Sequence, residues 1–126
     1  GYDVGSSLAA RMDGSIVQSG GASGEAVFGR GEENETRLRP TWTNATAMFV
    51  AAYRSDGNLS WVRSSRGLHP DANALGTTVL SDGSIVATGR FVGDFKCGGA
   101  GGEKVDFTSF GEMDVFLMRL KKDDLP

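Results

Sequence analysis

The feature that most constrains the fold is an internal repeat. The pentapeptide Asp-Gly-Ser-Ile-Val at residues 13–17 recurs unchanged at residues 82–86, which is 69 residues later. Further pairs keep nearly the same spacing, namely Gly20 and Gly89, Phe28 and Phe95, and Phe49 and Phe116. A repeated unit buries its apolar face against its neighbour, so a chain of this kind is an array of similar units. We therefore predict two units, residues 1–67 and residues 68–126.

The pattern inside each unit indicates strands. Asp-Gly at residues 13–14, 56–57 and 82–83 is typical of tight hairpin turns, because glycine accepts a positive φ. The segments after the turns are rich in Ile, Val and Thr, which strands favour. We predict strands at about 6–12, 15–20 (continuing as far as 29 in one interpretation), 47–54 and 58–64 in the first unit, and at about 75–81, 84–92 and 114–121 in the second.

Four-stranded antiparallel units repeated along a chain are typical of β-propeller blades. The repeat is long for a blade, and the excess lies in residues 29–44 and 96–112, which are polar and rich in glycine. We expect these to be long surface connections that carry function or disorder. The predicted fold is all-β: two antiparallel four-stranded β-propeller blades, the second without its outer strand, from a larger or oligomer-forming propeller.

Composition excludes several other classes of protein. The chain has 126 residues and a net charge of −3, so no basic surface for nucleic acid is expected. The longest apolar stretch, residues 45–53, is far shorter than the roughly 20 residues of a membrane-spanning helix. The 19 glycines follow no collagen period, and the single cysteine excludes an intrachain disulfide. Because the chain begins without Met, we expect a mature, cloned or excised segment.

Four motifs follow one another in the first unit and carry a family resemblance. They are Gly1-x-Asp3-x-Gly5, Asp13-Gly14-Ser15-Ile16-Val17-x-x-Gly20, Phe28-Gly29-x-Gly31-Glu32-x-Asn34-Glu35-Thr36-x-Leu38, and Phe49-Val50-Ala51-x-Tyr53-x-x-Asp56-Gly57-x-Leu59-x-Trp61. This ordered set resembles the bacterial β-propeller repeats called SBBP repeats, and the likeness covers about 1.8 repeats. The second copy departs from the pattern after Phe95. The resemblance implies a propeller architecture in a large secreted or cell-surface protein, extracellular or in the cell envelope, with no catalytic residues.

No set of catalytic residues is visible. His69 is the only histidine, and no Gly-x-Ser-x-Gly elbow accompanies it, so we interpret it as an exposed residue between the units. Cys97 is followed by glycines and has no nearby base, which favours a loop or core thiol over a nucleophile. Residues 98–104 lack the order of a phosphate-binding loop, since Glu103 follows the last glycine. We predict a protein that is not an enzyme and has no cofactor.

Acidic residues do not form a metal-binding pattern. A calcium loop needs several oxygen ligands at alternate positions, whereas Asp13, Asp56 and Asp82 each stand alone before a turn. We expect these carboxylates to accept hydrogen bonds from turn backbone. The acidic stretch 32–35 alternates with arginines and is interpreted as a solvated loop.

Two tryptophans bear on ligand binding. Trp61 is expected to pack between units, whereas Trp42 lies in a polar connection and is a candidate ligand contact. The predicted function is a non-catalytic structural or protein-interaction module of a larger secreted or cell-surface protein. Its partners would be the remaining blades of a parent chain or copies of itself, with a protein or glycan ligand possible, and without nucleic acid or membrane insertion. The alternative is a lectin-like or small-ligand-binding propeller assembled from several copies.

The third strand of each unit also predicts assembly. Residues 48–51 and 115–118 are apolar at every position, and such strands are normally covered on both faces. Two units alone would leave large apolar faces uncovered, so we expect the chain to remain part of a longer polypeptide or to associate with itself.

Overall fold

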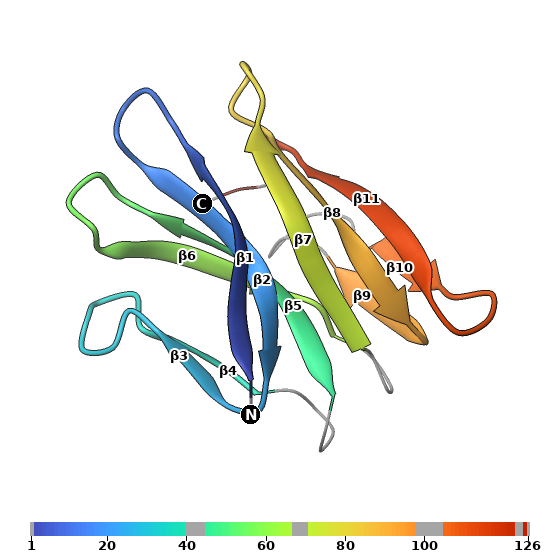
Figure 1. The fold of residues 1–126 in the computed structure, drawn as a ribbon. Coiled ribbons are helices and arrows are strands. Elements are labelled where there is room, and N and C mark those ends of the chain that lie inside the picture. Colours follow the sequence, from blue (N-terminus) through green and yellow to red (C-terminus); the bar gives the residue numbers. More distant parts are fainter. Residues whose placement is uncertain (1, 40–44, 67–70, 98–104, 123–124, 126) are drawn as a thin grey trace.

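The fold is all-β, as the sequence predicts. The computed structural model describes residues 2–39, 45–66, 71–97, 105–122 and 125. Within these residues there are eleven strands and no α-helix, and every pair of strands is antiparallel (Figure 1). None of the described segments forms a helix with the length and apolar character needed to cross a membrane.

The first unit forms a four-stranded sheet. Its strands are β1 (Asp3–Ala10), β2 (Ile16–Ser23), β5 (Thr46–Tyr53) and β6 (Leu59–Ser64), in the spatial order β1-β2-β5-β6. The four strands thus follow one another as a meander. The sequence places them correctly, although β1 begins three residues before the predicted start.

The second unit forms a three-stranded sheet with the same order. Its strands are β7 (Asp71–Val79), β8 (Ile85–Val92) and β11 (Asp114–Leu120), in the order β11-β8-β7. β7 corresponds to β1, β8 to β2 and β11 to β5. Among the described residues no strand occupies the position of β6, so the outer edge of β11 is unpaired there.

The three Asp-Gly turns share one geometry, which confirms the predicted hairpins. In the first, the Arg11 N–H donates to the Ser15 carbonyl (2.8 Å) and the Gly14 N–H donates to the Arg11 carbonyl (3.1 Å). The corresponding bonds recur from Arg54 and Gly57 and from Leu80 and Gly83. The three glycines have φ values of +83°, +89° and +86°, which a β-branched residue resists.

A β-bulge recurs at the same place in both units. It lies between Gly5 and Ser7 in β1 and between Ala74 and Gly76 in β7. Opposite each bulge a Cβ atom has no room: one added to Gly20 would lie 1.9 Å from the Val4 carbonyl oxygen, and one added to Gly89 would lie 1.8 Å from the Asn73 carbonyl oxygen. The repeated glycine is therefore required by the close approach of neighbouring backbone.

The connections between the second and third strands, predicted as long surface connections, contain two short pairs of strands. β3 (Ala26–Phe28) pairs with β4 (Thr36–Leu38), and β9 (Asp94–Cys97) pairs with β10 (Val105–Thr108). Ala26 and Leu38 are buried against the first sheet. Three- and four-residue strands are too short for an alternating pattern to stand out from a polar, glycine-rich background.

The main core lies between the two sheets. Val17, Val50 and Trp61 from the first sheet pack in one cluster with Ala74 and Phe116 from the second. β7 runs against β1, β2 and β5 (Figure 1), and the β7 backbone is joined to β1 by a hydrogen bond from the Thr77 N–H to the Ser7 hydroxyl (3.0 Å). Trp61 is 6% exposed, in agreement with the predicted packing between units.

A second cluster covers the other face of the first sheet. Ala22, Phe49 and Leu59 are buried there beneath residues of the β3–β4 hairpin. β5 is consequently enclosed on both sides, as predicted for residues 48–51: its six central residues are all buried.

β11 is covered on one face only. Phe116 and Met118 are buried, but Val115 is 83% exposed and Leu117 is 72% exposed. Residues 115–118 thus leave one apolar face uncovered, as expected for two units without a further unit or partner. The reason is positional: the first sheet covers one face of the second sheet, and nothing in the described part of the chain covers the other.

Candidate functional site

Several residues singled out from the sequence lie outside the described residues. They are Trp42, His69 and the glycine-rich segment 98–104. The predicted ligand contact at Trp42 and the predicted exposure of His69 therefore remain predictions.

Cys97 lies at the end of β9 in the core. Its side chain is 4% exposed and belongs to the cluster between the sheets, together with Phe95 and Phe107. The Phe95 and Phe107 rings are stacked with centroids 4.6 Å apart. This position agrees with the interpretation of Cys97 as a core thiol.

The turn aspartates cap backbone, as expected. The Asp82 carboxylate accepts a hydrogen bond from the Ser84 N–H (2.8 Å) and forms an ion pair with Arg119. The Ser84 backbone bond and, less strongly, Arg119 lower the pKa of Asp82; hydrogen bonds within the turns lower the pKa of Asp13 and Asp56 in the same way. No group of three or more His, Cys, Asp or Glu side chains in the described part of the chain is arranged to hold a metal ion.

The acidic stretch 32–35 after β3 was predicted to be a solvated loop, but two of its residues form hydrogen bonds to β6. The Glu32 carboxylate accepts a hydrogen bond from the Leu59 N–H, and the Asn34 amide donates to the Leu59 carbonyl (3.2 Å). The backbone N–H and the backbone carbonyl of Leu59 in β6 are thus both hydrogen-bonded to side chains of this loop. Burial and the neighbouring Glu32 raise the pKa of Tyr53, which pairs with Leu59 across the strands. Glu32 and Asn34 therefore attach the β3–β4 hairpin to the first sheet.

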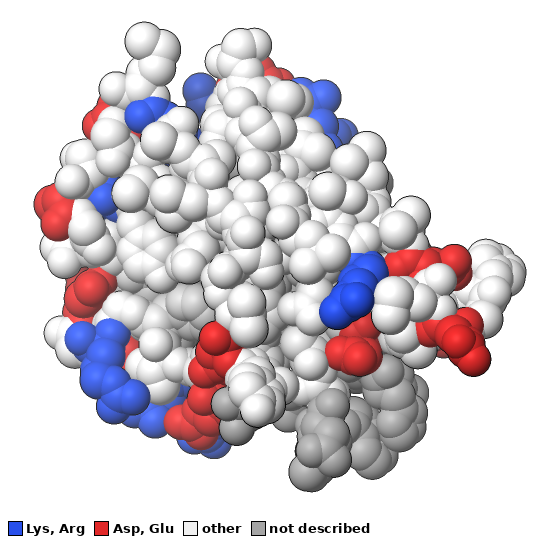
Figure 2. Space-filling view, in the orientation of Figure 1, with Lys and Arg blue, Asp and Glu red and all other residues white. Residues whose placement is uncertain are grey.

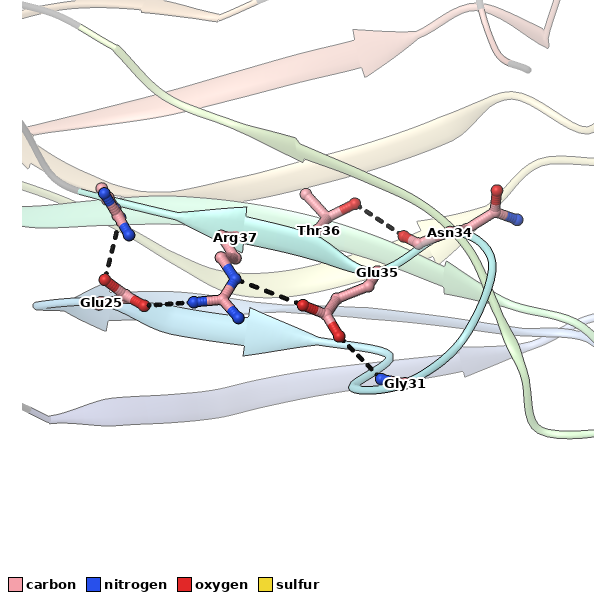
Figure 3. A network of polar contacts seen from close by, with 7 residues as sticks. Glu25, Gly31, Asn34, Glu35, Thr36 and Arg37 are labelled. Carbon is pink, nitrogen blue, oxygen red and sulfur yellow. Dashed lines mark hydrogen bonds and ion pairs between the residues drawn. The ribbon is translucent and has the colours of Figure 1, made fainter.

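The rest of the loop forms an exposed network of charges (Figure 3). Arg37 contacts Glu25 (3.2 Å) and Glu35 (3.3 Å), and Glu35 accepts a hydrogen bond from the Gly31 N–H (2.8 Å). The Gly31 bond, and then Arg37, lower the pKa of Glu35. The Arg37 side chain is 52% exposed, so solvent screens these pairs and they stabilise the fold only weakly. A carboxylate with a lowered pKa is also a poor general base near neutral pH.

A small pocket lies beside the start of the second sheet. It has a volume of about 50 Å³ and is lined by Asp71, Asn73, Arg90, Phe91, Val92 and Met113. That volume accommodates a few water molecules. A sugar ring or cofactor needs a much larger site.

One face of the molecule is poor in charge. Figure 2 shows Lys, Arg, Asp and Glu mostly around the rim of the face that displays β1, β2 and β7. Among these three strands only Asp3 and Asp71 carry a charge, and Val4, Leu8 and Leu75 are at least half exposed. Such a surface suits contact with protein better than contact with the phosphates of nucleic acid.

The most pronounced candidate is the outer face of the second sheet, defined here as the face that carries Val86, Thr88, Arg90, Val115, Leu117 and Arg119. These residues pair across β8 and β11, which places them on one side of the sheet. Val115 and Leu117 occupy the repeat positions of Met48 and Val50, which are both fully buried between the sheets in the first unit. The sequence shows the apolar residues, but only the packing shows that they are uncovered.

Comparison with known proteins makes no assignment: no protein-family model matches the chain, and no curated protein matches it. The resemblance to SBBP repeats therefore stays a prediction.

Proposed function

We propose that the chain is a non-catalytic structural and protein-interaction module, built from two β-propeller-type units, of a larger secreted or cell-surface protein. The observation that carries the proposal is the stacking of two equivalent sheets. The inner side of the first sheet, with Met48 and Val50, is covered by the second sheet, whereas the equivalent side of the second sheet exposes Val115 and Leu117.

The stacking favours extension of the array. A face that is buried in one unit and open in the next is suited to receive another unit or a protein partner. Val115 and Leu117 are both more than 70% exposed, and grouped exposed apolar residues are characteristic of interaction surfaces. Asp13, Asp56 and Asp82 hold turns, and Glu32 and Asn34 hold a hairpin, which favours a scaffold over an enzyme. The secreted or cell-surface location rests on the resemblance alone.

Light scattering across a dilution series tests the proposal. We expect the wild-type chain to associate at micromolar concentration, and Val115→Glu combined with Leu117→Glu to give a folded monomer, because two carboxylates replace the apolar contact. Met12→Glu is the matched control, since Met12 is fully exposed at a hairpin turn. A wild-type chain that stays monomeric, or association unaffected by the double substitution, would argue against the outer face as an interaction surface.

A lectin-like module is the second proposal, and its support is the aromatic residue Trp42 in the connection between β4 and β5. Aromatic rings stack on the apolar faces of sugars. A glycan array probed with wild-type protein and with Trp42→Ala tests it. Saturable binding that is lost in the variant favours the lectin, and absence of binding removes it.

A further inference from the structure

We propose that the outer edge of β11 is an acceptor site for an extended peptide segment of the β6 type, which would complete the second sheet as a fourth strand. The inference rests on the proposed function and names the site and the chemistry of its partner. Main-chain pairing along the edge would provide affinity, and side chains at alternate positions would provide selectivity.

The first unit shows how such a strand is held. β6 runs antiparallel along β5, with Val50 opposite Arg63, Ala51 opposite Val62 and Ala52 opposite Trp61. β11 stands at the same repeat position as β5 and pairs with β8 as β5 pairs with β2. Its other edge is paired with no strand among the described residues.

The edge lacks the usual features that discourage pairing. Exposed edge strands are normally protected by proline, lysine, a bulge or a short length. β11 has seven residues, contains neither proline nor lysine, and pairs with β8 without a register shift. Its one basic residue, Arg119, is engaged by Asp82. The edge is therefore long and regular enough to receive a strand.

Side chains on the outer face of the second sheet also favour a strand of the β6 type. An incoming strand in the β6 register would place its equivalent of Trp61 beside Arg119, on the face that carries Leu117. In the first unit, Trp61 is buried on the corresponding face. An aromatic residue at this position would cover Leu117, which is 72% exposed.

The bulge in the first sheet specifies the partner further. The register shifts between Ala52 and Tyr53, and this shift lets Leu59 enter the cluster under the hairpin while Trp61 enters the cluster between the sheets. The matching segment thus has an aliphatic residue two positions before an aromatic residue, with the two side chains on opposite faces. Alternating apolar strands without this spacing should fit less well.

A peptide tests the site directly. The probe is a synthetic peptide with the sequence of residues 55–66, labelled with fluorescein and titrated into the full 126-residue chain below the concentration at which the chain associates. We expect a saturable rise in anisotropy, together with slower amide hydrogen exchange confined to residues 114–120. Leu117→Glu should weaken binding about tenfold, because a charge replaces the covered leucine.

Two controls make the result specific. Leu75→Glu changes a half-exposed leucine on β7, the opposite edge strand of the same sheet, and should leave affinity unchanged. A peptide with serine at the positions of Leu59 and Trp61 should bind at least about tenfold more weakly. Absence of binding, equal binding of the serine peptide, or protection outside residues 114–120 would overturn the proposal.

The result is separable from the proposed function. Association of the chain that depends on Val115 and Leu117, without peptide binding, would refute the edge site and leave the interaction module in place. Absence of both association and peptide binding would refute both.

Discussion

Glycine at the Asp-Gly turns holds a backbone conformation that other residues reach only at a cost. Gly83 has a φ of +86°, and a Cβ atom there would lie 3.1 Å from the Lys122 side chain. The neighbouring Asp82 carboxylate caps the same turn through the Ser84 N–H. Turn closure therefore depends on two adjacent residues that the sequence alone identifies.

Gly83→Val should destabilise the chain by roughly 1–2 kcal/mol or more, because left-handed backbone crowds a branched side chain. The measurement is the free energy of unfolding from urea denaturation. Gly76→Ala is the control, since Gly76 has no positive φ and its added Cβ would make only an ordinary contact with Thr88 at 3.4 Å. An unchanged free energy of unfolding in the valine variant would contradict this requirement for glycine at residue 83.

The turn carboxylates also predict an acid dependence. Asp13, Asp56 and Asp82 have pKa values lowered from 3.8 in the folded chain, mainly by hydrogen bonds from turn residues. A lowered folded pKa adds stability that is fully present above the unfolded pKa and is lost as the pH falls through the folded pKa. The melting temperature should therefore decrease when the pH is lowered beyond about 4.

A triple variant with Asn in place of these three aspartates isolates the effect. Asn keeps an oxygen that accepts the turn hydrogen bonds but does not titrate. Its melting temperature should change less between pH 5 and pH 2 than that of the wild type. Parallel curves for the two proteins would assign the acid dependence to other groups.

At the level of elements, the two inserted hairpins are attached in different ways. The loop of β3–β4 is fastened to β6 by Glu32 and Asn34 through Leu59. β9, by contrast, pairs with residues after β6: the Arg66 N–H donates to the Lys96 carbonyl (2.8 Å), and the Lys96 N–H donates to the Arg66 carbonyl (2.6 Å). The departure of the second copy from the motif thus coincides with a change from side-chain to main-chain attachment.

Glu32→Ala should cost about 1.5–3 kcal/mol, because it leaves the Leu59 N–H without its charged acceptor. Glu32→Gln retains an acceptor oxygen and should cost less. Chemical denaturation measures the stability, and faster hydrogen exchange at the Leu59 amide would locate the effect. Glu33→Ala is the control because Glu33 is exposed. Equal stability of the Glu32 and Glu33 alanine variants would contradict a stabilising role for the Glu32–Leu59 hydrogen bond.

The sequence predicts a strand well where residues within or next to that strand indicate it. Asp-Gly turns and the β-branched residues after them place the starts of β2 and β8 within one residue. β3 falls only within the interpretation that continues the second strand to residue 29. The short strands β4, β9 and β10 were missed because each gains its partner and its burial from the rest of the fold. Glu32 was misinterpreted for the same reason, since its bonding partner Leu59 lies 27 residues away.

For the whole molecule, the shared core predicts that the two units unfold together. Val17, Val50 and Trp61 lie in one cluster with Ala74 and Phe116 of the other sheet, and separation of the sheets would expose all of them. A cluster of this kind couples the stabilities of neighbouring units.

Urea unfolding should therefore show a single transition. In a Trp42→Phe variant, Trp61 is the remaining tryptophan and reports on the interface. Its fluorescence and the far-ultraviolet circular dichroism should give the same midpoint. Loss of the fluorescence signal well before the loss of strand signal would show that the units separate before they unfold.

The sequence by itself determined the repeat, the all-β class, the three turns and the seven main strands. These follow from composition and from residues a few positions apart, where glycine conformation and side-chain alternation act directly. Only the tertiary structure decided which apolar faces are covered. Residues 48–51 and 115–118 have similar composition, but the first segment lies between a hairpin and a second sheet, and the second lies at the open side of the stack. Burial depends on what the rest of the chain places opposite a strand, and a strand's own residues do not contain that information.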